Sequence, residues 1–394
     1  MEALKRRLNN PLSVVLANSI IGALIFWVLK AEFAGSIALM IAIVAAILLL
    51  DRFDVVNCMF GAYIANKIPA IISGIAVCVV VPLLLGANNY IMHISTLAVI
   101  YAIACLGLNF QMGSTDMVNF APAAFMGVGA YSVAVCTVVY SLSPWVGLLA
   151  GIFISAIFGV IIGLPTLRTK GYYLSLVTMA MQIAFTQLIY NTRFLGGANG
   201  IPGVSRYSIL DFSLYSRYTI LGKRFAPQFP YLMLCICILA LLTYISMRIY
   251  FSRTGLSLNV IAQDPIAANC LGINVSRQKL FAFVIGGVFC GISGSLLASL
   301  ESYAGPDNYN FSRSLMLICM VILGGMDNSI GVISGAFLLT IISEKLRDFA
   351  DFQQFVYGAI LIIMLIVRPS GLIPKRTRDY CGICKRTLKF TDTK

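Results

Sequence analysis

The sequence predicts an all-α polytopic membrane protein with about 10–12 transmembrane helices and both termini in the cytoplasm. Composition is the first observation: the 394 residues are 59% hydrophobic and only 11% charged, whereas soluble domains are about 25% charged. The second is that the apolar residues form long runs without strand alternation, so that helices, rather than a barrel, satisfy the backbone in lipid. The third is a biased distribution of Lys and Arg.

Twelve apolar runs are the predicted helices. They cover residues 12–29, 33–50, 68–87, 90–112, 117–140, 144–164, 171–190, 230–250, 280–300, 314–326, 330–343 and 353–367. The runs 314–326 and 330–343 are short for full crossings. As an alternative they form a re-entrant hairpin around Gly324, Gly325 and Asp327, which requires that this backbone is buried in protein.

The basic residues set the predicted orientation. A cytoplasmic N-terminus, with Lys5, Arg6 and Arg7, also places most other Lys and Arg residues inside, including those of the tail from Arg368 onward. The basic start and first apolar run resemble a signal peptide. No clear small-residue cleavage site follows, so we interpret the run as an uncleaved helix.

The loop at 191–229 carries basic residues on the predicted outer side, against this trend. Arg193, Arg206 and Arg217 are its candidate docking residues for an acidic partner. An ordinary solvated loop explains the charge about as well.

Several classes of site are excluded by the residues present. The chain has one histidine, His93, and no GxxxxGK[ST] motif, so we expect no catalytic site, no metal site, no cofactor and no ATP binding by a P-loop. Cys381 and Cys384 form a lone CxxC, which more often represents two reduced thiols than a zinc site. The net charge of +13 follows from the inner Lys and Arg bias and needs no nucleic acid.

The stretch 107–131, GLNFQMGSTDMVNFAPAAFMGVGAY, is the most polar part of an otherwise apolar region. Polar groups are costly in a membrane, and a helix broken by proline often marks a transport path. The candidate path residues here are Asn109, Gln111, Asp116, Asn119 and Pro122. The alternative is close helix packing through Ala123, Gly127 and Ala130.

The predicted helix at 171–190 carries a stripe of polar residues. Ser175, Thr178 and Gln182 have spacing i, i+3, i+7 and therefore share one helix face. They complete the candidate path set, or they hydrogen-bond a neighbouring helix.

The stretch 258–277, LNVIAQDPIAANCLGINVSR, is predicted to contain a two-turn cytoplasmic helix at 265–271. Asp264 is its N-cap, Pro265 its first residue and Gly272 its stop. So short a helix is marginal alone. We expect it to insert into a groove on a partner or to pack against its own helix ends.

Four ordered stretches give a resemblance to a known family. They are LGLNFQMGSTDMVNFAPAAFMGVGAY; LPTLRTKGYYLSLVTMA with FLGGANGIPGV; TGLSLNVIAQDPIAANCLGINV followed by KLFAFVIGG; and MVILGGMDNSIGVISGA with VRPSGLIP. Together they resemble the permease subunits of ATP-binding-cassette importers of the LivM branched-chain amino-acid type. The resemblance covers residues 90–374.

The resemblance implies a multi-pass subunit of the plasma membrane, which is the inner membrane if the cell is Gram-negative. It implies a protein that transports branched-chain amino acids and is not itself an enzyme. Its implied partners are a second permease of LivH type, two cassette ATPases, an extracytoplasmic substrate-binding protein and membrane lipid. The coupling segment is implied to be 254–276. Its matching residues are Gly255, Asp264, Ala267, Ala268 and Gly272, with fewer charges than the family usually carries.

The resemblance implies a permease core at 89–374. The residues outside it are expected to form extra transmembrane helices at 1–88 and a basic cytoplasmic tail at 375–394. Alternatives are a permease for urea, short amides or other amino acids, and a gradient-driven carrier. A membrane enzyme is disfavoured, because the expected metal or acid–base motifs are missing from the sequence.

Overall fold

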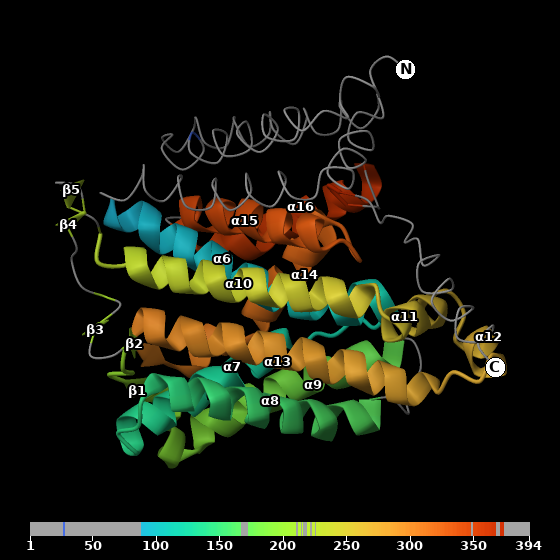
Figure 1. The fold of residues 1–394 in the computed structure, drawn as a ribbon, viewed down its shortest axis with the longest axis horizontal. Coiled ribbons are helices and arrows are strands. Elements are labelled where there is room, and N and C mark those ends of the chain that lie inside the picture. The colour runs from blue at the N-terminus through green and yellow to red at the C-terminus, as the bar shows by residue number, and fades with distance from the viewer. Residues whose placement is uncertain are drawn as a thin grey trace, which may run out of the picture. The chain divides into compact units, whose positions relative to one another are not determined.

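The computed structural model describes Trp27 and residues 88–166, 172–209, 212–213, 215, 219–220, 223–224, 226–347, 350–367 and 371–373. The predicted spans 33–50 and 68–87, nearly all of 12–29, Arg217 and the tail cysteines lie outside these residues. Figure 1 shows a largely helical chain. Six of the described helices are long and apolar enough to cross a membrane.

The elements follow in this order: α6 (Asn89–Thr115), α7 (Pro122–Ala134), the π-helix η1 (Val135–Val139), α8 (Pro144–Thr166), α9 (Tyr172–Asn191), the short helices η2 (Arg193–Leu195) and η3 (Gly197–Asn199), β1 (Ile201–Pro202), β2 (Ser208–Ile209), β3 (Phe212–Ser213), β4 (Thr219–Ile220), β5 (Lys223–Arg224), α10 (Phe229–Tyr250), α11 (Arg253–Gln263), α12 (Pro265–Cys270), α13 (Val275–Glu301), β6 (Tyr303–Ala304), η4 (Pro306–Tyr309), α14 (Phe311–Gly324), α15 (Ser329–Lys345) and α16 (Ala350–Val367).

The chain divides into two compact units. One comprises residues 1–96, 214–236 and 340–348; the other comprises 97–213, 237–339 and 349–394. All of the contacts discussed below lie within the second unit.

Helix α7 forms the core of the second unit, and all thirteen of its residues are buried. It packs against α8 and α13. A Cβ added to Gly129 would lie 1.9 Å from the carbonyl oxygen of Gly291, and one added to Gly294 would lie 1.8 Å from that of Met126. The backbones of α7 and α13 therefore approach closely, which only residues without a Cβ permit.

The predicted span 117–140 is wrong at its start, because helix begins only at Pro122. Residues 116–121 separate α6 from α7, and Asp116 has a φ of 53°. Proline is favoured in the first turn of a helix, where its missing N–H is no loss. The helix break therefore precedes Pro122 rather than following it.

Helices α14 and α15 correspond to the predicted runs 314–326 and 330–343, and their re-entrant arrangement in a membrane stays a prediction. The helices are 14 and 17 residues long and are joined at residues 325–328. Gly325 has a φ of 110°, and Asp327 a φ of 67°. Backbone amides of Leu372 and Ile373 donate to the carbonyls of Leu323 and Gly324, so the chain returns to the end of α14.

The loop after α9 contacts the end of α13 through a two-stranded antiparallel pairing. Ile201 pairs with Ala304, and Pro202 with Tyr303. The amides of Gly203 and Val204 both donate to the carbonyl of Ser302. This part of the predicted external loop therefore has a fixed position on α13.

Candidate functional site

The broken segment between α6 and α7 is surrounded by buried polar side chains. The amide of Ala124 donates to Oε1 of Gln182 at 2.7 Å, and that of Ala123 donates to Oγ of Ser314 at 3.1 Å. The first amides of a helix have no partner within the helix. Side chains from α9 and α14 provide those partners here.

The polar side chains on α9 form hydrogen bonds with successive backbone groups of the broken segment and of the start of α7. Ser175 Oγ donates to the carbonyl of Val118, Thr178 Oγ1 accepts from the amide of Phe120, and Gln182 reaches Ala124. The prediction that Ser175, Thr178 and Gln182 share one helix face is confirmed. Their role as a path remains a prediction, because in this structure they bond the backbone of the break.

Gln182 connects three elements. Its Oε1 also accepts from Ser314 Oγ at 3.0 Å, and its Nε2 donates to the carbonyl of Tyr309 at 2.8 Å. One fully buried side chain therefore joins the start of α7, the start of α14 and the segment before it.

On the other side of the break, Gln111 and Asn119 make a second set of contacts. Nδ2 of Asn119 donates to Oε1 of Gln111 at 2.7 Å, and Nε2 of Gln111 donates to the carbonyl of Phe283 at 2.9 Å. Oδ1 of Asn119 accepts from the amide of Ala121 at 2.8 Å. These residues connect the break to α13.

Asn109 connects the break region to two other elements. Its Nδ2 donates to the hydroxyl of Tyr250 at 2.9 Å, and its Oδ1 accepts from the amide of Asp327 at 2.7 Å. Ser114 Oγ donates to Oδ1 of Asp327 at 3.0 Å. Asn109 thus joins the last residue of α10 to the turn between α14 and α15.

Asp116 differs from the other candidate path residues because it is exposed. Its charge interacts with that of Lys279, in the second turn of α13. The structure therefore brings Gln111, Asn119, Pro122, Ser175, Thr178 and Gln182 around the helix break. Asn109 belongs to a neighbouring set of bonds with Tyr250 and Asp327, and Asp116 is exposed.

Sequence reasoning missed Ser314, Tyr250 and the side chain of Asp327 as members of these two sets of contacts. Ser314 has a weak signal as a polar residue at the start of an apolar run. Tyr250 has no sequence signal that would connect it to the other polar residues, since an aromatic residue at a helix end is common in membrane proteins.

The predicted two-turn helix is α12, and its capping is confirmed. Oδ1 of Asp264 accepts from the amides of Ile266 and Ala267 at 2.8 and 3.2 Å. Gly272 has a φ of 77°, and the amide of Ile273 donates to the carbonyl of Ala268. This is a Schellman ending, which favours glycine.

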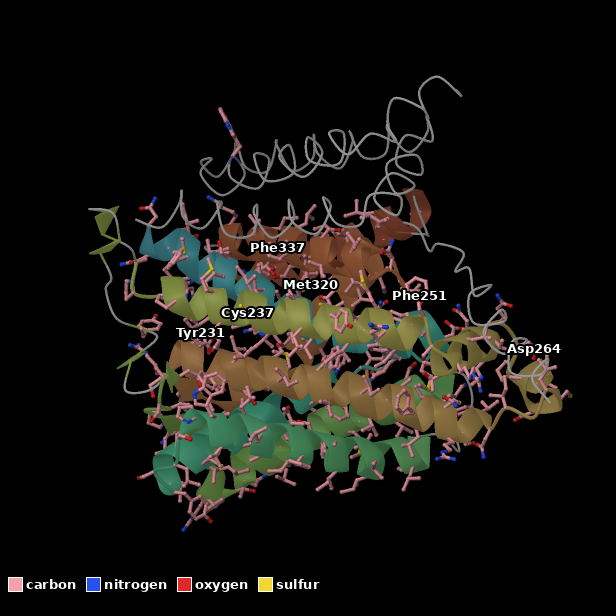
Figure 2. All side chains as sticks on the ribbon, in the orientation of Figure 1. Tyr231, Cys237, Phe251, Asp264, Met320 and Phe337 are labelled. Atoms are coloured by element: carbon pink, nitrogen blue, oxygen red, sulfur yellow. The ribbon has the colours of Figure 1, made fainter. Side chains whose placement is uncertain are left out.

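Helix α12 presents an apolar surface to its surroundings. Ile266 is 76% exposed and Leu271 is 71% exposed, while Ala268 is buried. Figure 1 shows α11 and α12 beyond the ends of α10 and α13, and Figure 2 labels Asp264 there. The sequence did not predict α11, which begins at a Ser252 N-cap and buries Gly255, Leu258 and Ile261 at a helical spacing.

The candidate docking residues Arg193 and Arg206 are both exposed. Nε of Arg206 donates to Oγ of Ser302 at 3.2 Å, next to the strand pairing with α13. Among the described residues no group of three His, Cys, Asp or Glu side chains has metal-binding geometry.

Comparison with known proteins identifies the family of this chain. Residues 90–365 match the model of the family described as branched-chain amino acid transport system / permease component. This chain belongs to that permease family. The match spans the helices from α6 to α16, the helix break and α12.

Curated relatives agree with the family match. The high-affinity branched-chain amino acid transport system permease protein LivM of Salmonella typhimurium is 32% identical over 71% of this chain and 69% of its own length. LivM of Escherichia coli has the same identity and coverage. A probable branched-chain amino acid transport permease protein LivH of Methanocaldococcus jannaschii is 25% identical over 70% of this chain and 90% of its own. No solved structure matches the chain.

Permease-family membership and six membrane-length apolar helices make this a multi-pass plasma-membrane protein. The predicted fold class, all-α and polytopic, is confirmed for the described part of the chain. The relatives are transport permeases rather than enzymes.

Proposed function

We propose that the chain is a permease subunit of an ATP-binding-cassette importer for branched-chain amino acids. The single observation that carries the proposal is the family match over residues 90–365. The names of the relatives supply the substrate class. The chain has no P-loop, and we propose that separate ATPase subunits, rather than an ion gradient, supply the energy.

We infer that α12 is the helix that contacts an ATPase. A two-turn helix with exposed Ile266 and Leu271 has the size and apolar surface to enter a groove on a partner. Gly255, Asp264, Ala267, Ala268 and Gly272 are its coupling residues. Of these, Asp264 and Gly272 fix the two ends of α12, and Ala268 is the residue that α12 buries.

The proposed orientation places both termini and α12 in the cytoplasm and the loop 191–229 outside. The region boundaries remain 1–88, 89–374 and 375–394, and α14 with α15 forms a re-entrant pair. A second permease of LivH type, two cassette ATPases and an extracytoplasmic binding protein complete the transporter. Arg193, Arg206 and Arg217 contribute to docking of that binding protein.

The coupling role is tested in the complete transporter reconstituted in proteoliposomes. Ile266→Glu and Leu271→Glu add charge to exposed positions, so folding is preserved, and an apolar groove would reject both. We expect both variants to lose ATP-dependent uptake. We also expect the ATPase subunits to dissociate from the permease during purification. The matched control is Ser143→Asp, which adds the same charge at the exposed start of α8. It should leave uptake and the association of the ATPase subunits unchanged. Normal uptake by both α12 variants would contradict the coupling role.

A further inference from the structure

A cluster of ionisable and hydroxyl side chains surrounds the segment between α13 and α14, apart from the helix break. It comprises Tyr101, Tyr131, Glu301, Tyr309 and Arg313, from α6, α7, α13, η4 and α14. The proposed orientation places this segment in the outer half of the protein, beneath the strand pairing of β1 with β6. A solute entering from outside would meet it before the helix break.

Two opposite charges in this cluster are held apart. Asn308 Nδ2 donates to Oε2 of Glu301 at 2.6 Å, and Arg313 donates to the hydroxyl of Tyr101, over whose ring its guanidinium also lies. Glu301 and Arg313 influence one another electrostatically but form no ion pair in the described part of the chain. Each charge has a neutral partner, and both side chains are partly exposed.

Two buried hydroxyls of this cluster have no hydrogen-bond partner. They belong to Tyr131, which is 5% exposed, and Tyr309, which is 0% exposed. Their rings form an edge contact at a centroid distance of 6.4 Å. Glu301, Arg313 and Tyr131 are all electrostatic neighbours of Tyr309.

Such an arrangement is costly unless something else completes it. A buried hydroxyl without a partner costs about 1–3 kcal/mol, and native proteins rarely keep one without a ligand, water or functional reason. A structural ion pair would bring Glu301 and Arg313 into direct contact. Two separated charges that both neighbour the unused hydroxyl of Tyr309 instead complement a ligand that carries both charges.

We propose that this cluster binds the headgroup of an α-amino acid zwitterion. Arg313 and the Tyr309 hydroxyl receive the carboxylate, because a guanidinium and a hydroxyl donor match its oxygens. Glu301 receives the ammonium group, and the Tyr131 hydroxyl supplies a further contact. This inference rests on the proposed function, and it adds a specificity site for the amino-acid headgroup.

Tyr309→Phe tests the site with little risk to folding, because it removes an oxygen atom that has no protein partner. The purified transporter without its binding protein is unfolded thermally with and without millimolar L-leucine. We expect leucine to raise the unfolding temperature of the wild type. We expect the ligand-free variant to be at least as stable as the wild type and to show no leucine shift.

The matched control is Ser246→Ala, which removes another buried hydroxyl without a hydrogen-bond partner, on α10. It should respond to leucine as the wild type does. Leucinol, which lacks the carboxylate, and 4-methylpentanoate, which lacks the amine, should both fail to stabilise the wild type. An absent leucine shift in the wild type, an unchanged shift in Tyr309→Phe, or equal stabilisation by either analogue contradicts the site.

Uptake measurements separate this inference from the function on which it rests. In proteoliposomes with all subunits and the binding protein, Tyr309→Phe should lower kcat/KM for leucine about tenfold, as expected for one hydrogen bond to a charged group. Wild-type uptake that Tyr309→Phe leaves unchanged overturns the site alone. A wild type that takes up no branched-chain amino acid overturns the proposed function.

Discussion

Asn109 and Tyr250 are joined by a hydrogen bond of 2.9 Å, although 141 residues separate them in the sequence. The ring of Tyr250 also stacks on that of Phe110 at a centroid distance of 4.7 Å. Tyr250 ends α10, and α11 and α12 follow directly. A movement of the proposed coupling helix therefore has a direct route of contacts to α6.

Replacing Asn109 tests this connection. Asn109→Leu removes both the bond to Tyr250 and the bond from the Asp327 amide, and we expect it to lower the free energy of unfolding by about 2–4 kcal/mol. Tyr250→Phe removes the bond from Asn109 and keeps the ring stack and the Asp327 bond of Asn109, so its cost should be about 1 kcal/mol. Thermal unfolding of the purified complex measures both. Equal effects would contradict the double role of Asn109.

The close approach of α7 and α13 predicts a steep cost for a single methyl group. Gly129→Ala should prevent stable folding or lower the unfolding temperature sharply, because its Cβ would overlap backbone atoms of Gly291. Gly358→Ala is the matched control in α16, where a Cβ meets nothing within 4 Å. Alanine should stabilise that exposed helical position by about 0.5–1 kcal/mol. Tolerance of Gly129→Ala would contradict the packing described for α7.

Gln182 is predicted to be the most sensitive polar residue of α9. Gln182→Leu removes three hydrogen bonds around the starts of α7 and α14, which we expect to cost about 3 kcal/mol or more. Gln182→Glu retains an acceptor for Ala124 and Ser314, but it buries a carboxylate that faces the Tyr309 carbonyl, so we expect it to be strongly destabilising as well. The control is Gln187→Leu, on the exposed face of the same helix, which should change stability little. Chemical denaturation in detergent ranks the three; similar losses for Gln182→Leu and Gln187→Leu would refute the ordering.

The exposed arginines of the loop 191–229, which we propose to lie outside, predict a salt-dependent docking step. Arg193→Glu combined with Arg206→Glu should weaken capture of the leucine-loaded binding protein several-fold at low salt, with the difference shrinking as salt screens the charges. Arg277→Glu makes the Arg-to-Glu change at a single residue at the opposite end of α13, half the charge change of the double variant, and should leave capture unaltered. Binding-protein capture on immobilised transporter measures the effect. A salt-independent loss would point to damaged loop structure instead.

The sequence was sufficient to predict the elements with a local signal. Long apolar runs predict the helices because each run satisfies its own backbone, and Asp264, Pro265 and Gly272 predict the ends of α12. The polar stripe on α9 follows from helical spacing alone. These features depend on residues at most a few turns apart.

The partners of those residues were not predictable in the same way. Asn109 meets Asp327 across 218 positions, and Gln182 meets Ser314 across 132. No periodicity relates such positions. The unpartnered hydroxyls of Tyr131 and Tyr309 were equally hidden, since burial and hydrogen bonding are properties of the packed chain.

The most direct test of the proposed function is uptake by the complete transporter in proteoliposomes loaded with ATP. Radiolabelled leucine is supplied with the binding protein, and unlabelled isoleucine, valine and urea serve as competitors. The account predicts accumulation that requires ATP and is competed by isoleucine and valine but not by urea. Accumulation that persists without ATP, or that urea alone competes, would contradict it.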